Sequence, residues 1–383
     1  MAWLCMMARL VCWGLKPLVM NTASFLQDTT DFLNKLNNIQ QLPPNTLLVT
    51  MDVESLYSNI PHKDGLAACH RFLSSSPDHK YTAEDVTRLI EFILTHNYFT
   101  FNNDIYLQCM GTAMGSKMAP QYANLFMADL EDKFLNSIQQ KPYRYYRYID
   151  DIFMIWTEGE ENLNQFFSLI NTFHPSIKLK MDYSNTHVNF LDTTVYIRDD
   201  KLHTSIYRKP TDRCSYLHSS SFHPQHTKRA IIHSQAIRYH RICSDPEDRD
   251  KHLRTLADSF HKKGYKDKTI NNSINTALKT RRENLLQYTE KKTNNRVPLV
   301  TTYNPALEGI KKIIKDLQPI ITEDETLKGI FQQPPLLAFR QPPNLRHKLI
   351  SRKLHSDYEV KNNGTNRECG IQSHIVFGRC QGL

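Results

Sequence analysis

One pair of carboxylates constrains the fold of this sequence more than any other feature. The segment YRYYRYI ends at residue 149, Asp150 and Asp151 follow it, and IFMIW comes directly after them. The aromatic and apolar residues on both sides predict the two arms of a buried β-hairpin. Carboxylates at the tip of a buried hairpin need a cation, because burying an unpaired charge is costly. Asp199 and Asp200, between VYIR and KLHTSIY, are typical of an ordinary polar turn instead.

A third carboxylate lies about a hundred residues earlier. Asp52 stands near the end of LLVTMDV, which predicts a short strand over 47–53. Asp52, Asp150 and Asp151 are therefore candidate catalytic and metal-binding residues, since two Mg²⁺ ions need hard oxygen ligands on rigid elements to promote in-line phosphoryl transfer to a 3′-hydroxyl. The alternative is that the adjacent aspartates only solvate a turn.

The remaining periodicity predicts an α+β layer up to about residue 207 and a helical region after it. Apolar residues at helical spacing predict helices over 22–40, 65–73, 82–96, 121–135 and 163–173. Period-two segments predict a hairpin at NYFTF and IYLQ and strands at IKLKMDY, VNFLDTTVYI and LHTSIY. Three further helices are expected at 225–242, 246–262 and 267–279, and the Pro-rich chain beyond residue 291 is typical of a linker and a tail.

Positive charge gathers in the helical region. The chain has 48 Lys and Arg against 39 Asp and Glu, a formal net charge of +9. Residues 201–300 contain 21 of the cations and nine of the anions, while the rest of the chain, with 27 against 30, is slightly acidic. This distribution favours a polyanionic partner for that region, and the 40% hydrophobic content excludes collagen-like and fully disordered chains.

Cysteine usage and the N-terminal segment bear on the compartment. The eight cysteines contain no CxxC pair, which favours a reducing environment, and the Cys and His residues of the basic region lack zinc-site spacing. Arg9 and Lys16 interrupt the apolar opening MAWLCMMARLVCWGLKPLVM, so we predict neither an anchor nor a secretion signal.

Four motifs occur in the order of the palm motifs of reverse transcriptases: LLVTMDVESLYSNIP, QCMGTAMGSKMAPQYANLFMADLE, YRYIDDIFMIW and VNFLDTTVY. DVESLYSNIPH, GTAMGSKMAP and the continuation YRKPTDRCSYLHSSSFHPQHTKRAIIHSQAIRYHRICSD resemble the reverse transcriptases of Penelope-like retroelements over roughly residues 20–350. This resemblance implies that Asp52 and Asp150 are metal ligands, that Asp151 supports the metal site, and that Tyr57 lies at the gate against ribonucleotides. A core tyrosine is the alternative for Tyr57.

The loop from Gln108 to Pro120 is the expected contact with template and nucleotide. Gly111 and Gly115 allow close backbone approach, and Gln108 and Ser116 offer hydrogen bonds, although a glycine pair before a helix is also typical of a plain turn. The resemblance places the family's template-and-nucleotide loop here, with Ala119 and Pro120 where many relatives have Ser-Pro.

Basic residues outside this loop have two expected roles. Either Lys178 or Lys180 could protonate the pyrophosphate leaving group, with a solvated strand face as the alternative. In the resemblance the basic helices form a thumb that grips the primer–template duplex, with a helix-turn-helix-like pattern over 246–278. The expected contacts to nucleic-acid backbone are Arg208, Lys209, Lys228 and Arg229.

Taken together, we expect an antiparallel palm sheet backed by helices and followed by an all-helical basic domain. The expected divisions are a remnant of the fingers or a connecting helix at 1–45, the palm at 46–207, the thumb at 208–290, and a linker and tail at 291–383. Against the family, most of the fingers and a GIY-YIG endonuclease are missing, so a truncated element copy is expected.

The expected function is that of an RNA-directed DNA polymerase core. It would use two Mg²⁺ ions, with Mn²⁺ as a substitute, an RNA template, a DNA primer and deoxynucleoside triphosphates. A catalytically inactive nucleic-acid-binding remnant is the alternative. We expect no membrane partner and infer no protein partner, and we expect an intracellular location, nuclear by analogy.

Overall fold

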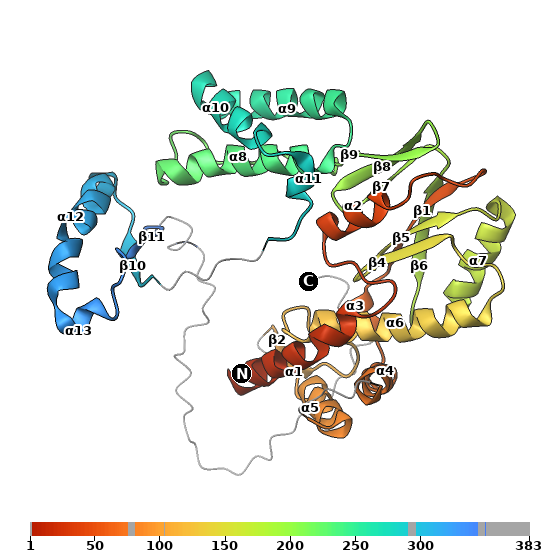
Figure 1. The fold of residues 1–383 in the computed structure, drawn as a ribbon. Helices are drawn as coiled ribbons and strands as arrows, with labels where there is room; N and C mark the ends of the chain where they lie inside the picture. The colour runs from red at the N-terminus through yellow and green to blue at the C-terminus, as the bar shows by residue number, and fades with distance from the viewer. Residues whose placement is uncertain (1, 76–80, 103, 290–295, 344–348, 350–383) are drawn as a thin grey trace, which may run out of the picture. The chain divides into compact units, whose positions relative to one another are not determined.

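The strand predicted at 47–53 and the hairpin predicted around residue 150 pair in one antiparallel sheet (Figure 1). The computed structural model describes residues 2–75, 81–102, 104–289, 296–343 and 349. The order of the sheet is β4-β5-β1-β6, with β4 at Arg144–Tyr148, β5 at Asp151–Trp156, β1 at Leu47–Val53 and β6 at Leu179–Ser184. β1 pairs with both β5 and β6, so its C-terminal end lies beside the turn between β4 and β5.

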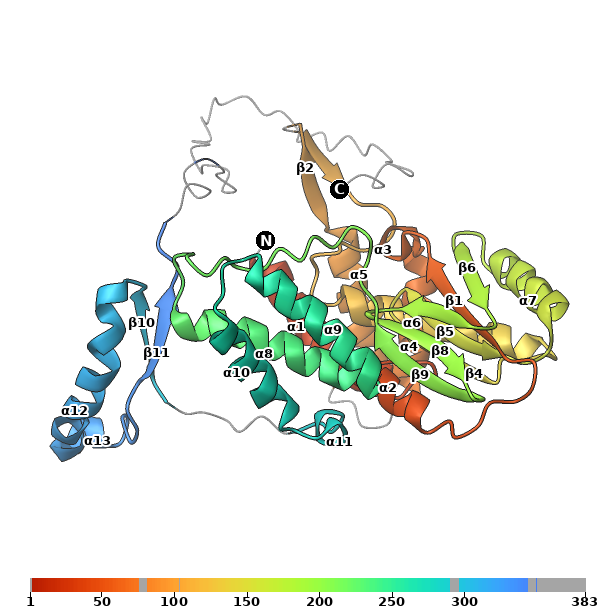
Figure 2. The same cartoon turned by 90° about the horizontal axis from the view of Figure 1, so that it is seen from above.

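Side chains of β5 alternate between two hydrophobic cores. Ile152, Met154 and Trp156 belong to a larger core with α6 (Ala119–Ser137) and α7 (Glu160–Phe173). Phe153 and Ile155 belong to a smaller core with α2 (Thr29–Asn37) and a second sheet. Successive side chains of a strand point to opposite faces, so a strand covered on both faces is apolar throughout, as IFMIW is. Figures 1 and 2 show α6 on one side of the sheet and α2 with β7, β8 and β9 on the other.

Several predicted elements of this unit are confirmed with small shifts. The helices α4 (His62–Ser74) and α5 (Ala83–Thr95) and the hairpin of β2 (Tyr98–Phe101) and β3 (Asp104–Leu107) follow the predicted order. The short helix α3 (Leu56–Asn59) was not predicted. The side chain of Thr82 caps α5 by accepting a hydrogen bond from the backbone N–H of Asp85. The helix expected at 22–40 is shorter, because Asp28 caps α2 and the preceding residues form turns.

The apolar opening of the sequence forms helix α1 (Ala2–Met20). One face of α1, which includes Val11 and Leu15, is buried in the larger core, whereas Trp3 and Trp13 on the other face are each 71% exposed. By length and composition alone, the window Trp3–Met20 is apolar enough to cross a membrane. A single helix of this kind is weak evidence for a membrane span. We expected Arg9 and Lys16 to interrupt this apolar segment, but it forms one continuous helix. The absence of a membrane partner stays a prediction.

The segment VNFLDTTVYI is a hairpin and not the single strand that we predicted. β7 (His187–Phe190) and β8 (Thr193–Arg198) pair antiparallel around a turn in which Leu191 has φ 54°. β9 (Lys201–Ile206) completes this three-stranded sheet across a turn at Asp199 and Asp200, the predicted polar turn. The period-two alternation predicts one continuous strand through Leu191, because the residue type alone does not show that this leucine adopts a left-handed conformation.

The described chain forms two compact units. The first extends to Thr211 and includes Ile242–Arg249, and the second contains Asp212–Arg241 and the chain from Asp250 onward. In the second, α8 (Gln225–Ile242), α9 (Pro246–His261), α10 (Asp267–Leu278) and α11 (Arg282–Leu285) bear out the prediction of three basic helices and add a fourth, short one. Apolar residues such as Leu256, Phe260 and Ile270 are buried there.

Residues 298–340 are folded, whereas we expected a linker and tail. The parallel strands β10 (Pro298–Thr302) and β11 (Leu336–Arg340) are connected through η1 (Pro305–Gly309), α12 (Ile310–Glu323) and α13 (Glu325–Lys328). The proline pairs that suggested a linker flank β11: Pro334 and Pro335 precede it, and Pro342 and Pro343 follow it, positions where a missing N–H is tolerated. We call these residues, with Arg296 and Val297, the C-terminal module.

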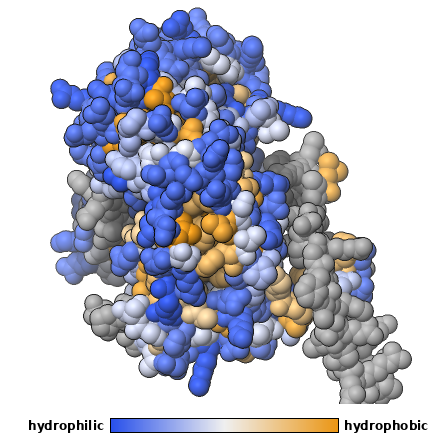
Figure 3. Space-filling model, turned by 90° about the vertical axis from the view of Figure 1, so that its right-hand side faces the viewer, coloured by the Kyte–Doolittle hydropathy of each residue, from blue (hydrophilic) through white to orange (hydrophobic). Residues whose placement is uncertain are grey.

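The α+β fold class is confirmed, with antiparallel palm-like sheets and helices followed by a helical domain. Figure 3 shows one face of the molecule, where hydrophilic side chains cover most of the surface and apolar ones are exposed near its middle.

Candidate active site

The sheet brings the three predicted carboxylates to one place. Asp52 in β1 lies directly opposite Asp151 in β5 in the antiparallel register. The backbone N–H of Val53 donates to the carbonyl oxygen of Asp150 at 3.0 Å, so the turn between β4 and β5 is fixed to the end of β1. Residues a hundred positions apart in the sequence thus share one edge of the sheet.

The electrostatics of this edge are those of uncompensated negative charge. Burial, followed by the charges of Asp150 and Asp52, raises the pKa of Asp151 to about 6. Burial and then the charge of Asp150 also raise the pKa of Asp52. Lys209 opposes both shifts, so it lies within electrostatic reach of the two carboxyls. The charged forms of Asp52 and Asp151 are therefore destabilised at this edge, an effect that a divalent cation would reverse.

The donor set fits magnesium by its chemistry. Carboxylate oxygens on paired strands are the hard, rigidly held ligands that Mg²⁺ takes in proteins. Within the described ranges, Asp52, Asp150 and Asp151 form no ion pair, and no group of three or more His, Cys, Asp and Glu side chains is arranged as a metal site. The assignment of the three aspartates as metal ligands therefore stays a prediction.

The backbone at the turn adopts a strained conformation. Ile149, immediately before the two aspartates, has φ 57°, which is unusual for a β-branched residue. Such strain persists only where the surroundings fix it, and it is common at functional sites. In this structure the side chain of Arg147 restrains the turn by a hydrogen bond to the carbonyl oxygen of Ile149.

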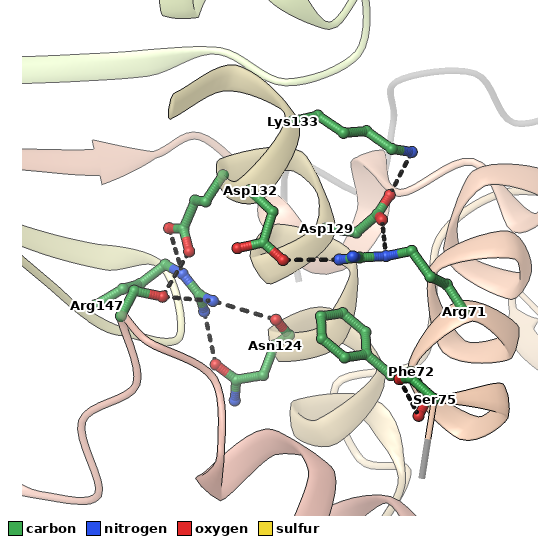
Figure 4. Close-up of polar contacts among 10 residues, drawn as sticks. Arg71, Phe72, Ser75, Asn124, Asp129, Asp132, Lys133 and Arg147 are labelled. Carbon is green, nitrogen blue, oxygen red and sulfur yellow. Dashed lines mark hydrogen bonds and ion pairs between the residues drawn. The ribbon is translucent and has the colours of Figure 1, made fainter. Parts of the chain in front are cut away.

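Arg147 provides the restraint, and the sequence analysis missed it. Its guanidinium is fully buried and donates to Asn124 Oδ1 at 2.6 Å (Figure 4). It also donates to Glu131 Oε1 at 2.6 Å and to the carbonyl oxygen of Ile149 at 3.1 Å. The side chain of Ser24 donates to the other oxygen of Glu131 at 2.6 Å. This buried network connects the chain before α2, helix α6 and the strained turn. The available signal was an arginine in a strand predicted to be buried.

Tyr57 lies beside the carboxylates. It is half-buried in α3, and burial followed by the charge of Asp150 raises its pKa. Its carbonyl oxygen accepts a hydrogen bond from the N–H of Thr112 at 2.7 Å, and the N–H of Gly111 donates to Ile60 at 2.9 Å. The loop expected to contact nucleotide is therefore attached to the helix that carries Tyr57.

The two glycines of this loop are not equivalent. Gly111 has φ 73°, and a Cβ added to it would lie 2.4 Å from the carbonyl oxygen of Tyr57. Nothing lies within 4 Å of a Cβ added to Gly115. Close backbone approach thus requires glycine at the first position only.

The polar side chains of the loop serve the loop itself. Gln108 accepts a hydrogen bond from Asn97 at 2.6 Å and donates to the carbonyl oxygen of Met110 at 2.9 Å. The hydroxyl of Ser116 is buried and has no partner among the described residues, and Ser116 lines an apolar cavity of about 530 Å³ beside α1 and α5. Neither side chain is directed to the carboxylates by a hydrogen bond in the described chain.

Only one of the two candidate general acids lies at the site. Lys180 pairs with Glu54 at 2.9 Å and stands opposite Asp52 in the register of β1 and β6. Lys178 instead donates to the carbonyl oxygen of Asn171 at 2.8 Å. Strand alternation makes both lysines candidates for the general acid. The hydrogen bond to Asn171 of α7 directs the side chain of Lys178 away from the site.

The four expected phosphate contacts also differ. Arg208 and Lys209 follow β9 in the first unit, half-buried and exposed respectively. Arg229 is exposed on α8. Lys228 is only 5% exposed and donates to the carbonyl oxygen of Ser219 at 2.6 Å. The structure therefore uses Lys228 inside the fold and not for a phosphate.

The antiparallel sheet with acidic residues at the end of β1 and at the turn before β5 defines a palm-type polymerase core. The family model described as reverse transcriptase (RNA-dependent DNA polymerase) matches residues 7–217, more than half of the chain. The chain belongs to the reverse transcriptase family. The model described as animal helix-turn-helix domain matches residues 215–275, which contain α8, α9 and most of α10.

A solved structure shows the same fold at low sequence identity. Telomerase from Candida albicans in complex with a fragment of telomeric RNA is 11% identical, with a TM-score of 0.52 over 85% of this chain and 56% of that chain. Apo telomerase from Candida tropicalis is 11% identical (TM-score 0.47, 71% of this chain and 50% of that one), and the RNA-dependent RNA polymerase of a human picobirnavirus is 12% identical (0.46, 71% and 51%). The chain thus spans about half the length of these proteins. No curated protein sequence matches it significantly.

Proposed function

We propose that this chain is an RNA-directed DNA polymerase that adds deoxynucleotides to the 3′-end of a DNA primer on an RNA template. The observation that carries the proposal is the pairing of Asp52 with Asp151 across two strands, with Asp150 at the adjoining turn. The raised pKa of Asp151 supports it, since a site built to bind cations gathers like charges that repel one another in the absence of metal.

Each residue has a distinct part in this proposal. Asp52 and Asp150 hold the metal ions, and Asp151 supports them from the base of β5. Mg²⁺ ions held there, or Mn²⁺ in their place, would supply Lewis-acid activation of the attacking hydroxyl and charge stabilisation in the in-line transition state. Tyr57 borders the sugar of the incoming nucleotide, and Lys180 is placed to donate a proton to the leaving pyrophosphate.

Primer extension tests the proposal. We expect the full chain to extend an annealed primer on an RNA template with Mg²⁺, and Asp150→Asn to reduce the rate by about a thousandfold, because losing one metal ligand removes several kcal/mol of transition-state stabilisation. Asp199→Asn is the matched control, since it makes the same substitution in an exposed turn between β8 and β9. Equal extension by the wild type and Asp150→Asn would show that the two-metal assignment is wrong.

Sugar selection provides a second test. Replacing Tyr57 by Val should increase ribonucleotide incorporation relative to deoxynucleotide incorporation, because the smaller side chain leaves room for the 2′-hydroxyl. An unchanged ratio would assign Tyr57 to the core instead.

The second candidate function is a catalytically inactive nucleic-acid-binding remnant, which the basic helical domain favours. Binding of primer–template without extension would support it. The affinity should then fall steeply with salt, because cations that contact phosphates release counterions.

We further propose an origin in a Penelope-like retroelement and a nuclear location. The DVESLYSNIPH and GTAMGSKMAP motifs support the origin, and the location rests on analogy with nuclear integration. Imaging of the tagged chain in cells tests the location, and exclusion from the nucleus would contradict it.

A further inference from the structure

The second unit contains a groove that the polymerase proposal does not use. It has a volume of about 970 Å³ and lies between the first turns of α8 and the C-terminal module. Five cations and two aromatic rings belong to its lining: Arg229, Arg296, Lys311, Lys312, Lys315, Tyr303 and Phe339. Arg296 is hydrogen-bonded within the C-terminal module, and the other four cations are exposed.

Aromatic packing fixes the walls of this groove to each other. The ring of Tyr303 is buried and contacts the rings of Phe222 at 5.2 Å and Phe339 at 5.4 Å, both edge-to-face. The ring of His226 on α8 lies 6.4 Å from that of Phe339. The guanidinium of Arg296 donates to the carbonyl oxygens of Pro334 and Pro335, which line the same groove, at 2.6 and 3.1 Å. The groove is therefore formed before any ligand enters.

The cations at the groove are available to a ligand. Lys311, Lys312 and Lys315 lie at helical spacing near the start of α12, and all three are exposed, as is Arg229 on α8. None of the four forms an ion pair in the part of the chain that the structure describes. Four positive charges around one groove favour a polyanion.

The apolar residues at the floor of the groove favour one class of polyanion over the others. Phe339 is half-buried, and Pro334 and Pro335 add apolar surface beside it. Cations that follow a phosphate backbone, combined with aromatic rings on which unpaired bases stack, are the features of single-strand binding sites. A duplex keeps its bases stacked inside, and the acidic side chains of a peptide carry no ring that could stack on Phe339. Both ligands would therefore contact only the cations.

We propose that this groove binds a single-stranded nucleic acid, with phosphates on the four cations and a base against Phe339. Single-stranded RNA and DNA share this chemistry. The site is separate from the polymerase chemistry, which depends on the carboxylates of the first unit.

The test measures binding of fluorescent twelve-nucleotide oligo(U) and oligo(dT) to the full chain by anisotropy over a series of salt concentrations. Saturating unlabelled primer–template duplex is present to occupy other nucleic-acid surfaces. We compare the wild type with the triple variant Lys311→Gln/Lys312→Gln/Lys315→Gln. Lys63→Gln/Lys141→Gln/Lys201→Gln is the control, because it removes the same charge from exposed lysines of the first unit.

Loss of three phosphate contacts should make the slope of log K against log[salt] shallower by about 2 and weaken binding about fiftyfold at 0.15 M salt, since each contact to a single strand contributes about 0.7 to the slope. The control should keep the wild-type slope to within about 0.5. The oligonucleotide that binds more tightly identifies RNA or DNA as the ligand. Asp150→Asn should bind like the wild type, so a failed polymerase proposal leaves this test intact.

Three results would overturn the proposal. The first is an equal loss in the two triple variants. The second is displacement of the oligonucleotide by polyglutamate at equal charge concentration, or complete displacement by the primer–template already present. The third result comes from the wild-type chain, so it does not depend on whether a variant folds. Photo-crosslinking of an oligonucleotide that carries 5-iodouracil at every position should label the peptide with Phe339 or Tyr303. Labelling confined to the first unit would exclude the groove as the binding site.

Discussion

Arg147→Met tests whether a buried network holds the acidic turn in place. The substitution removes the guanidinium but keeps much of the side-chain volume. Glu131, which is 3% exposed, then loses its cationic partner, and the carbonyl oxygen of Ile149 loses a donor. The side chains of Ser24 and Tyr145 still donate to Glu131, at 2.6 and 3.0 Å.

The geometry sets the expected size of the effect. Removing one partner of a buried ion pair costs about 3–5 kcal/mol, because the other charge stays buried without compensation. Since two neutral donors to Glu131 remain, we expect the lower end, about 3 kcal/mol. For a unit of this size each kcal/mol lowers the melting temperature by about 2–4 °C, so the expected decrease is about 6–12 °C.

Urea unfolding monitored by tryptophan fluorescence measures this effect. All three tryptophans lie in the first unit, and Trp156 is fully buried in β5, the strand that pairs with β4, which carries Arg147. The double variant Arg147→Met/Glu131→Met is the control, because replacing both charges by apolar groups removes the unpaired carboxylate. We expect the double variant to be more stable than Arg147→Met alone. A cost below about 1 kcal/mol for Arg147→Met, or a double variant at the sum of the single ones, would refute the reasoning.

Three further predictions concern the same unit. Gly111→Ala should destabilise the first unit by at least about 2 kcal/mol in urea unfolding, because its Cβ meets the backbone of Tyr57 in a left-handed conformation, and Gly115→Ala should cost less than about 1 kcal/mol; equal costs would contradict the assignment. Tyr122→Phe should raise the free energy of unfolding by up to about 1 kcal/mol, since its hydroxyl is buried without a partner in the described chain, and a loss of stability would reveal a missing partner. In metal-free buffer, ionisation of Asp151 costs stability as the pH rises from 3.8 to about 6, because burial and neighbouring carboxylates raise its folded-state pKa. Asp151→Asn should therefore stabilise the protein at pH 7.5 by about 1–2 kcal/mol, allowing for partial exposure, and not at pH 4; the same gain at both pH values would exclude this cause.

The sequence by itself determined the order and type of most elements. The apolar run IFMIW predicted an arm of a buried hairpin, which is β5, and the helical spacing over 82–96 predicted α5. These signals act over a few residues, through side-chain period and local hydrogen bonds. The acidic pair at the hairpin tip was visible for the same reason, because aspartate between apolar arms conflicts with burial.

The sequence also misled at particular places. Leu191 turns the chain in a left-handed conformation that leucine rarely adopts, so one strand was predicted where there are two. Prolines near residues 334 and 342 suggested a linker, although the first pair leads into β11 of a folded module. In both cases strand pairing outweighs the local preference, within a hairpin for β7 and β8 and across the module for β10 and β11.

Only the tertiary structure decided which of several equivalent residues faces the site. Strand alternation made Lys178 and Lys180 equal candidates, and contact with α7 directs Lys178 away while Lys180 stands opposite Asp52. Likewise Arg147 owes its position to Glu131 and Asn124 on α6. Local sequence fixes the period of a strand or helix, but the partner that a side chain meets depends on which distant element packs against it, and this requires the folded chain.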